Sequence, residues 1–149
     1  MSSPEGSTVV FRRAPAEVRP RVLERFVRRL QAEVAKGSQF DCLITGDAEL
    51  RKLNLEFRGK DYATDVLSFP ADGPDGHLGD IAISLARARA QARQFGHSTE
   101  QEIQILMLHG LLHLAGMDHE ADSGQMARAE KRWRSRLGLP NGLIERVRA

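Results

Sequence analysis

Residues 109–119 read HGLLHLAGMDH and contain three of the chain's five histidines. His109 and His113 are four residues apart, so on a helix both side chains project from the same face, one turn above the other. Gly116 follows where a helix can end in a left-handed residue, a conformation that glycine adopts without steric cost. A reversal at Gly116 would bring His119 back toward the other two imidazoles. The stretch therefore predicts a central helix that ends at a cluster of three histidines.

This cluster has the composition of a metal-ligand set. Three imidazoles that meet at one point suit zinc, which takes neutral nitrogen ligands and keeps its fourth position for water at catalytic sites. The alternative is a pair of packed core histidines, because the pattern His-x-x-x-His often occurs without a metal. The apolar run IQILML at residues 103–108 indicates a buried helix, in which unpaired imidazoles would be costly to desolvate. We therefore predict one zinc ion per chain, bound by His109, His113 and His119.

The spacing of the histidines is that of the metzincin peptidases, His-Glu-x-x-His-x-x-Gly-x-x-His. In those enzymes the glutamate after the first ligand is the general base. Gly110 occupies that position here. The ligand spacing is kept but the peptidase base is missing, which argues against peptide hydrolysis.

Apolar periodicity divides the rest of the chain into strands and helices. Asp47 is expected to cap the second helix, Ser98 or Thr99 the central one, and Asp122 or Ser123 the final one. The two strands that precede the third helix are expected to pair antiparallel. The expected elements are strands at 8–13, 40–45, about 64–70 and 79–84, and helices at 21–36, 47–57, 85–95, 99–115 and 123–137.

Length and composition indicate one globular domain. The chain has 149 residues, of which 41% are hydrophobic and 28% charged, a balance typical of folded domains. Cys42 is the single cysteine, so it has no disulfide partner and is expected to pack in the core of a protein from a reducing compartment. The polar segment 1–7 is expected to be frayed. The chain contains neither a signal-peptide pattern nor 18 consecutive apolar residues, so we expect a cytoplasmic location and no membrane partner.

The net charge of +2 is unevenly distributed. Residues 1–36 carry 8 basic and 4 acidic residues, residues 128–149 carry 7 and 2, and residues 37–127 carry 7 and 14. Arginine outnumbers lysine 18 to 4, and arginine is the better residue for two-point phosphate contacts. Charge alone leaves two readings open, an RNA-binding surface and ordinary solvated helix faces. The basic residues of the first and final helices are Arg21, Arg25, Arg28, Arg29, Arg128, Lys131, Arg132, Arg134 and Arg136.

Three linked blocks of sequence resemble one family. They are FRGKD at 57–61 with TDVLSFP at 64–70, LGDI at 78–81, and the histidine stretch at 109–119 with GHS at 96–98. Each block alone is a weak signal, but the three in this order are specific and span nearly the whole domain. The chain resembles the YbeY family of bacterial rRNA-maturation factors, which are zinc-dependent endoribonucleases specific for single-stranded RNA.

The resemblance implies a fold, a function and site residues. The fold is a single α+β domain over residues 1–149, with a mixed four-stranded sheet, about five helices and a metal-binding central helix. The function is cleavage of single-stranded RNA in 16S rRNA 3′-end maturation and ribosome quality control, with ribosomal subunits or ribosomal proteins as partners. The family's zinc ligands fall on His109, His113 and His119, and its functionally essential arginine falls on Arg58.

The charged residues near the predicted metal can be given roles. A zinc ion with three imidazole ligands lowers the pKa of its bound water to about 7. Negative charge builds on the non-bridging oxygens during phosphodiester cleavage, so the guanidinium of Arg58 is the predicted catalytic group. The alternative for Arg58 is a surface arginine at a helix end. Asp118 and Glu120 are candidates to orient a histidine ligand or assist proton transfer, and the alternative is that they are solvated turn residues.

Other polar residues are weaker candidates. Asp65 and Asp80 lie near strand ends, where they can face a cleft or cap a turn. His77 and His97 are expected to be structural polar residues.

Two other classes of function remain open. In the first, the zinc is structural and the protein binds rRNA or ribosomes as an assembly factor without cutting RNA. In the second, the site hydrolyses another substrate, such as a peptide. A structural zinc site is closed by four protein ligands, and no cysteine is placed to be the fourth, which favours catalysis. The alternative is that Asp118 or Glu120 fills the fourth position.

Overall fold

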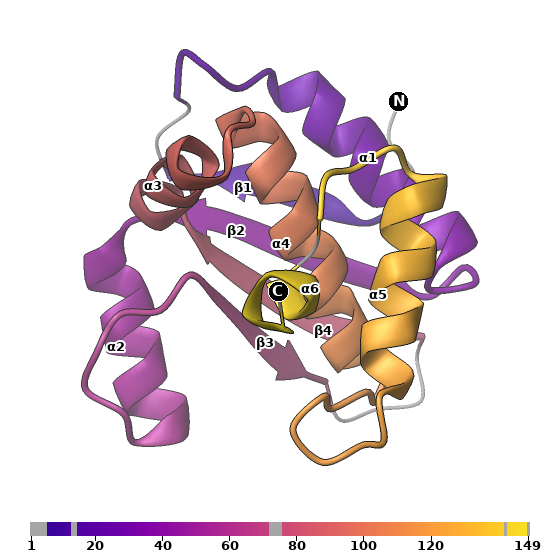
Figure 1. Cartoon of the computed structure of the whole chain (residues 1–149). Helices are drawn as coiled ribbons and strands as arrows, with labels where there is room; N and C mark the ends of the chain where they lie inside the picture. The colour runs from indigo at the N-terminus through magenta and orange to yellow at the C-terminus, as the bar shows by residue number, and fades with distance from the viewer. Residues whose placement is uncertain (1–5, 13–14, 72–75, 142, 149) are drawn as a thin grey trace.

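Four strands form one mixed sheet at the centre of the molecule (Figure 1). The computed structural model describes residues 6–12, 15–71, 76–141 and 143–148. The sheet has the order β1-β2-β4-β3, with β1, β2 and β4 parallel and β3 antiparallel to β4. This confirms the predicted α+β fold with a mixed four-stranded sheet. The strands are β1 (Thr8–Phe11), β2 (Gln39–Thr45), β3 (Val66–Pro70) and β4 (His77–Ser84).

Six helices surround the sheet in the described part of the chain, one more than the five expected. The additional helix is the short C-terminal α6. Figure 1 shows α4, α5 and α6 in front of the sheet. The helices are α1 (Pro20–Glu33), α2 (Asp47–Arg58), α3 (Leu85–Phe95), α4 (Thr99–Leu114), α5 (Gln125–Arg136) and α6 (Leu143–Arg148).

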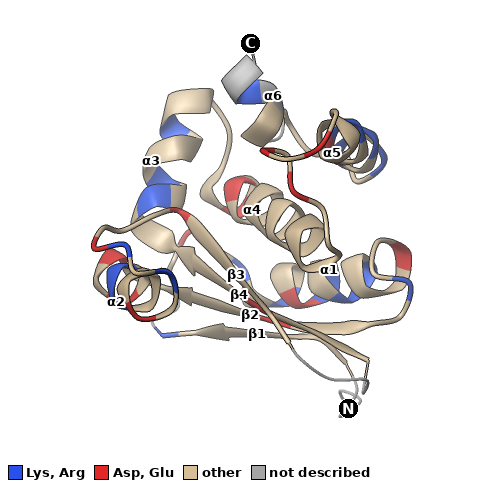
Figure 2. Ribbon diagram, turned by 90° about the horizontal axis from the view of Figure 1, so that it is seen from below, with Lys and Arg blue, Asp and Glu red and all other residues tan. Residues whose placement is uncertain are grey.

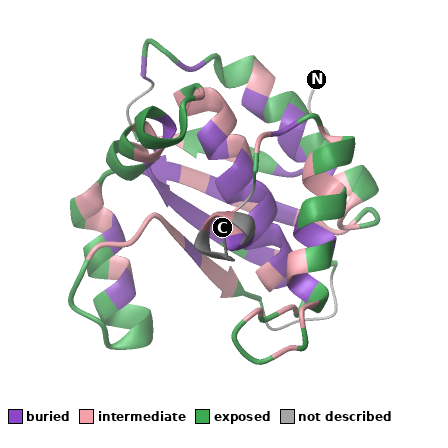
Figure 3. Cartoon of the chain, viewed as in Figure 1, coloured by how far each residue is buried: buried purple, intermediate pink, exposed green. Residues whose placement is uncertain are grey.

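The central helix α4 is buried on almost all sides (Figure 3). Its start is fixed by Ser98, whose hydroxyl accepts from the Gln101 backbone N–H, while the Gln101 side chain accepts from the Ser98 backbone N–H. This reciprocal pair satisfies two donors that a helix start leaves unpaired. The apolar run predicted to be buried is the part of α4 that packs on the sheet.

Gly110 lets α4 lie close to the sheet. A Cβ at this position would stand 3.0 Å from the Ile81 Cγ2 atom and 3.1 Å from the Ser68 hydroxyl oxygen. That hydroxyl donates to the Gly110 carbonyl at 3.0 Å. The residue at the position of the metzincin base therefore faces β3 and β4, and a glutamate side chain has no room there.

Different helices pack on the two faces of the sheet. Ser68 and Ile81 face α4, whereas their neighbours Leu67 and Ala82 pack with Leu50 of α2 on the opposite face. This alternation follows from the two-residue period of a strand. Cys42 is a buried free cysteine of the core, as expected, and burial raises the pKa of its thiol.

Several predicted boundaries differ from the structure. Asp47 is the first residue of α2, and Gly46 takes the cap position. Gly124 is the cap residue of α5. The Asp122 carboxylate accepts from the Gly124 and Met126 backbone N–H groups, so it satisfies donors at the start of the helix as a capping side chain would.

One residue of the segment 1–7, which was predicted to be frayed, is held in place by hydrogen bonds. Ser7 is buried, and its N–H and hydroxyl donate to the Gln31 side chain, so it is not frayed. Residues 1–5 of that segment and Arg13 of the first predicted strand lie outside the described residues. Among the described residues, none of the helices is long and apolar enough to cross a membrane.

Candidate metal centre

The end of α4 brings the three histidines together. Gly116 adopts a left-handed φ of 95°, the Gly116 N–H donates to the His113 carbonyl, and the Met117 N–H donates to the Leu112 carbonyl. These two bonds form the Schellman arrangement that reverses the chain after a helix. His119 then returns over the last turn of α4. The reversal predicted from Gly116 is the one that the structure contains.

The three imidazole rings surround one point. Ring centroids lie 4.9 Å apart for His109 and His113, 5.5 Å for His109 and His119, and 5.6 Å for His113 and His119. One ring nitrogen from each histidine lies within 4.8 Å of the others, so the group can hold a metal ion. Among the described residues, no further histidine, cysteine or carboxylate joins this group. Three nitrogen ligands with a remaining open position are the donor set of catalytic zinc sites.

The electrostatic surroundings of His113 favour its neutral form. Burial lowers the pKa of His113, and the neighbouring His109 and His119 lower it further. A neutral imidazole has a free nitrogen lone pair, the form that binds metals. The Nδ1 atom of His119 is buried and has no hydrogen-bond partner in the described part of the chain. Burying a nitrogen without a hydrogen-bond partner costs free energy. A bound metal ion is one partner that such a cluster of nitrogens can have.

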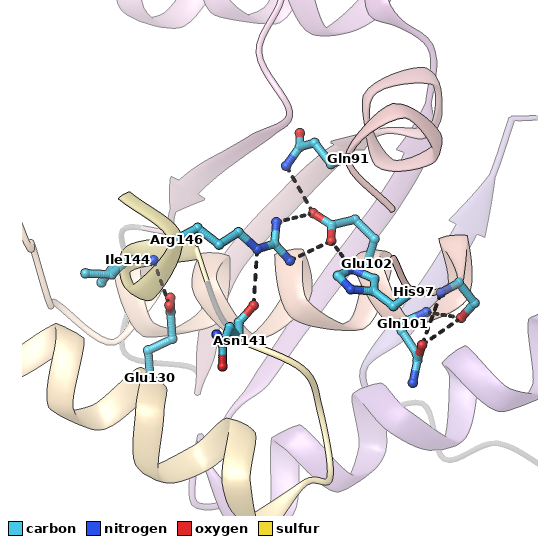
Figure 4. A network of polar contacts seen from close by, with 9 residues as sticks. Gln91, His97, Gln101, Glu102, Glu130, Asn141, Ile144 and Arg146 are labelled. Atoms are coloured by element: carbon cyan, nitrogen blue, oxygen red, sulfur yellow. Dashed lines mark hydrogen bonds and ion pairs between the residues drawn. The ribbon is translucent and has the colours of Figure 1, made fainter. Parts of the chain in front are cut away.

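Glu130 of α5 holds the first histidine in place. Its Oε2 atom lies 2.6 Å from the His109 Nδ1 atom, and both side chains are buried. The other carboxylate oxygen accepts from the Ile144 N–H of α6 at 2.9 Å (Figure 4). A carboxylate on Nδ1 leaves Nε2 as the ligand atom and fixes the orientation of the ring. His109 is thus tied through Glu130 to the C-terminal helix.

Glu130 was not among the predicted site residues. It occupies an apolar position of α5, at helical spacing from Met126 and Trp133, where both Met126 and Glu130 are buried. A single acid on the apolar stripe of a helix is the signal in the sequence that points to a buried partner. The sequence contains no information on which partner that is, because His109 lies 21 residues away.

The three histidines line a cavity of about 520 Å³, and the other predicted site residues line it too. Arg58, Asp118 and Glu120 line it together with the three histidines. Arg58 is exposed at the end of α2, and none of the described residues forms a hydrogen bond or ion pair with its guanidinium. Arg58 and the histidines are 51 to 61 residues apart in sequence, and the fold brings them to one cavity.

The acids beside His119 have a local structural contact. The Asp118 carboxylate accepts from the Glu120 N–H at 3.0 Å, within the turn between α4 and α5. Asp118 acts on His113 through its charge, which partly offsets the lowering of the pKa of that imidazole. The orienting contact to a histidine ligand comes from Glu130, and any role of Asp118 and Glu120 in catalysis stays a prediction.

The remaining polar candidates lie away from the three histidines or have other contacts. Asp65 lines the metal-side cavity, and its carboxylate accepts from the next backbone N–H, that of Val66. His77 begins β4 and Asp80 lies in the middle of that strand, and the His77 Nε2 atom contacts Asp41 at 3.1 Å. His97 is buried against Glu102, whose carboxylate also binds Arg146 of α6 through two hydrogen bonds (Figure 4).

Comparison with known proteins agrees with this geometry. The family model described as Endoribonuclease YbeY matches residues 12–138. A protein named Endoribonuclease YbeY from Solibacter usitatus is 72% identical over 149 residues, which is 100% of both chains. A protein of the same name from Koribacter versatilis is 47% identical over 93% of this chain and 91% of its own.

The chain belongs to the YbeY family. The solution structure of TM1509 from Thermotoga maritima is similar to the structure of this chain, with a TM-score of 0.58 and 29% identity. The match covers 87% of this chain and 93% of TM1509. The resemblance inferred from three short sequence blocks is therefore confirmed over the whole domain. In this member of the YbeY family, the matched region includes the histidine cluster, Arg58 and Glu130.

The Glu130–His109 contact leads to a prediction about metal affinity. Glu130→Gln is expected to weaken zinc binding by about 10–100-fold, the usual effect of losing an outer partner of a ligand. Both oxygens of the Glu130 carboxylate accept, one from His109 and one from the Ile144 N–H. The glutamine amide has only one oxygen, so its N–H group would face one of these two donors. Competition with a chromophoric chelator measures the affinity, and thermal unfolding checks the fold.

Asp118→Asn is the matched control, because it neutralises an acid beside the site that contacts the Glu120 backbone. It is expected to change zinc affinity much less than Glu130→Gln. Equal losses in the two variants would show that Glu130 has no special part in holding His109.

Proposed function

We propose that this protein is a zinc-dependent endoribonuclease that cuts single-stranded RNA, acting in the cytoplasm on the 3′ end of 16S rRNA and in ribosome quality control. The observation that carries the proposal is one cavity that joins three histidines to an unpaired arginine. Membership of a family whose relatives are named endoribonuclease supports RNA as the substrate. The link to 16S rRNA and to ribosomal partners rests on the family resemblance alone.

Each residue has a separate task in this proposal. His109, His113 and His119 hold the zinc, and Glu130 keeps the His109 ring in the ligand orientation. When bound, zinc supplies a Lewis acid that makes water a nucleophile near neutral pH. Arg58 stabilises the negative charge that develops on the non-bridging oxygens of the scissile phosphate in the transition state, which a planar guanidinium can contact at two points.

The contacts in the structure weigh against the two alternatives. The histidine group has no fourth protein ligand among the described residues, so it differs from a closed structural site. Gly110 lies against Ile81 and Ser68, which leaves no room for a peptidase base at that position. An RNA-binding assembly factor remains the second candidate function, since the arginine-rich helices would serve it equally well.

The basic helices α1 and α5 contact each other at one point. The Arg29 guanidinium of α1 donates to the Arg136 carbonyl of α5 at 3.4 Å, and Figure 2 shows lysine and arginine along both helices. The two basic segments at the ends of the sequence are therefore neighbours in space. We propose that the basic surface of these helices contacts RNA phosphates outside the metal-side cavity.

The direct test of the function compares substrates. Zinc-loaded protein is incubated with single-stranded RNA, duplex RNA and casein, and the same series is repeated after chelation. Internal cleavage of the single-stranded RNA alone, lost on chelation, is the expected result. Cleavage of casein would support the peptidase alternative, and tight RNA binding without any cleavage would support the assembly factor.

The basic surface is tested through the salt dependence of binding. Replacing both Arg25 and Arg28 by Gln should make the slope of log affinity against log salt shallower by about 1.4, because each phosphate contact on a single strand contributes about 0.7. Fluorescence anisotropy with labelled single-stranded RNA measures the slope.

A double variant with Arg51→Gln and Arg89→Gln is the control with the same change in net charge. Those arginines already form ion pairs with Asp61 and Glu17. If both double variants shift the slope equally, the α1 surface is an ordinary solvated helix face and makes no RNA contact.

A further inference from the structure

A second cavity, of about 880 Å³, lies on the sheet face that α2 covers. Arg58, Ser68 and Pro70 line both this cavity and the metal-side cavity, so the two adjoin. Its volume is in the range of pockets that hold small molecules or parts of larger ones. Nothing in the proposed chemistry at the histidines uses it. We call it the outer trough.

The floor of the outer trough consists of two rows of residues across the sheet. Strand register aligns the apolar lining residues Val10, Leu43 and Ala82 in one row. The adjacent row contributes Asp41, Asp80 and Phe69 to the lining. The trough therefore has an apolar floor bordered on one side by two carboxylates.

An aromatic pair forms the wall nearest to Arg58. The rings of Phe57 and Phe69 lie 5.2 Å apart at an interplanar angle of 61°. Phe57 is 63% exposed, although it directly precedes Arg58 at the end of α2. Exposed phenylalanine next to a catalytic cavity offers a flat apolar surface for a planar ligand.

The charges select the kind of ligand. The Asp80 side chain is 61% exposed, and the His77 Nε2 atom lies 3.9 Å from its carboxylate, too far for a hydrogen bond, so the carboxylate keeps its acceptor capacity and disfavours a phosphate at this end of the trough. Arg12 also lines the trough, and its guanidinium contacts the Glu49 carboxylate at 3.4 Å. The same carboxylate can accept hydrogen bonds from the N–H groups on the edge of a nucleobase. Asp41 is already occupied, by the Thr8 N–H and hydroxyl and by His77. An aromatic wall, an apolar floor and one available acceptor together match a base and not a backbone.

We propose that the outer trough binds one unpaired nucleobase of the RNA whose phosphodiester lies at the histidines. This inference rests on the proposed endoribonuclease function and deepens it. The base contacts Phe57, its edge faces Asp80, and its phosphate passes Arg58 between the two cavities. A base in a duplex is stacked and paired on its Watson–Crick edge, so it cannot enter the trough. The trough is thus a physical cause of single-strand specificity.

Phe57→Ala tests the stacking contact. Zinc-loaded Phe57→Ala is expected to bind a short labelled single-stranded RNA roughly 10-fold or more weakly than wild type, the usual effect of losing one base–aromatic contact. Fluorescence anisotropy, read before the RNA is cut appreciably, gives the affinity. A gel of the same sample confirms that the RNA is still intact, and metal analysis confirms unchanged zinc. Leu55→Ala is the control, since Leu55 is a half-exposed apolar residue of the same helix that does not line the trough.

An RNA with a single abasic position, moved along the strand, identifies the bound base. Wild type and Leu55→Ala should lose affinity at one position, and Phe57→Ala should not. Equal affinity of wild type and Phe57→Ala for intact RNA would overturn the proposal, and that result is also expected if a protein partner occupies the trough. The assay measures binding alone, so a wild-type protein that binds through Phe57 but cuts no RNA would contradict the proposed function and leave the base site in place.

Discussion

His113→Ala is expected to lose most of the bound zinc. The variant removes one of three ligands from a group whose ring centroids lie 4.9–5.6 Å apart, and no described residue is placed to replace it. Affinity should therefore fall by more than the roughly 10–100-fold expected for loss of an outer partner such as Glu130. Metal analysis after dialysis and chelator competition measure the loss.

His77→Ala is the matched control for this variant. His77 is also partly buried, but it contacts the Asp41 carboxylate at the start of β4 and does not belong to the three-histidine group. Its removal should leave the zinc content unchanged. Equal zinc in wild type and His113→Ala, with both correctly folded, would contradict the three-histidine site.

Arg58→Ala is expected to reduce RNA cleavage by roughly 100-fold or more at saturating RNA, while zinc content and RNA affinity change little. An interaction that strengthens only as charge develops in the transition state lowers the rate and not the binding. The magnitude is that of removing one electrostatic donor from a preorganised site. Single-turnover cleavage at several RNA concentrations separates the rate at saturation from the affinity.

Two further variants locate the effect at Arg58. Arg58→Lys should recover only part of the rate, because an ammonium cannot make a planar two-point contact with phosphate. Arg51→Ala removes an arginine of the same helix that is paired with Asp61 and should cut RNA like wild type. If Arg58→Ala reached the wild-type rate at saturating RNA, Arg58 would only dock the substrate.

The histidine cluster was predictable because its geometry is local. The four-residue spacing of His109 and His113 and the glycine at 116 define a helix face and a reversal within eleven residues. Local rules also predicted the strands and the long helices, since apolar periodicity reports burial. The predicted α+β fold is confirmed for that reason, and the errors are in caps, in element ends and in the unpredicted C-terminal helix α6.

Contacts between distant elements were not predictable in this way. Glu130 looks like one more charged residue of a basic helix until α5 is packed on α4 and its carboxylate meets His109. The short α6 has too few residues for a clear period, and its position depends on the Glu102–Arg146 ion pair and on Ile144. The strand register that forms the outer trough likewise depends on pairing across four strands.

Gly110 shows how a sequence signal can have a second cause. The missing peptidase base was inferred from motif comparison, as the absence of a glutamate. The structure adds a packing reason. The glycine lets α4 approach Ile81 and Ser68, and the Ser68 hydroxyl donates a hydrogen bond to the Gly110 carbonyl. The same residue thus sets the helix–sheet distance that positions the histidines over β3 and β4.

We propose that RNA cleavage requires zinc held by the three histidines. The most direct measurement is titration of zinc into chelated, dialysed protein while cleavage of single-stranded RNA is followed. Cleavage should be absent at the start, rise in proportion to added zinc and level off at one zinc per chain, with no such response in His113→Ala. Cleavage by the metal-free protein, or cleavage that rises equally in His113→Ala, would contradict the account.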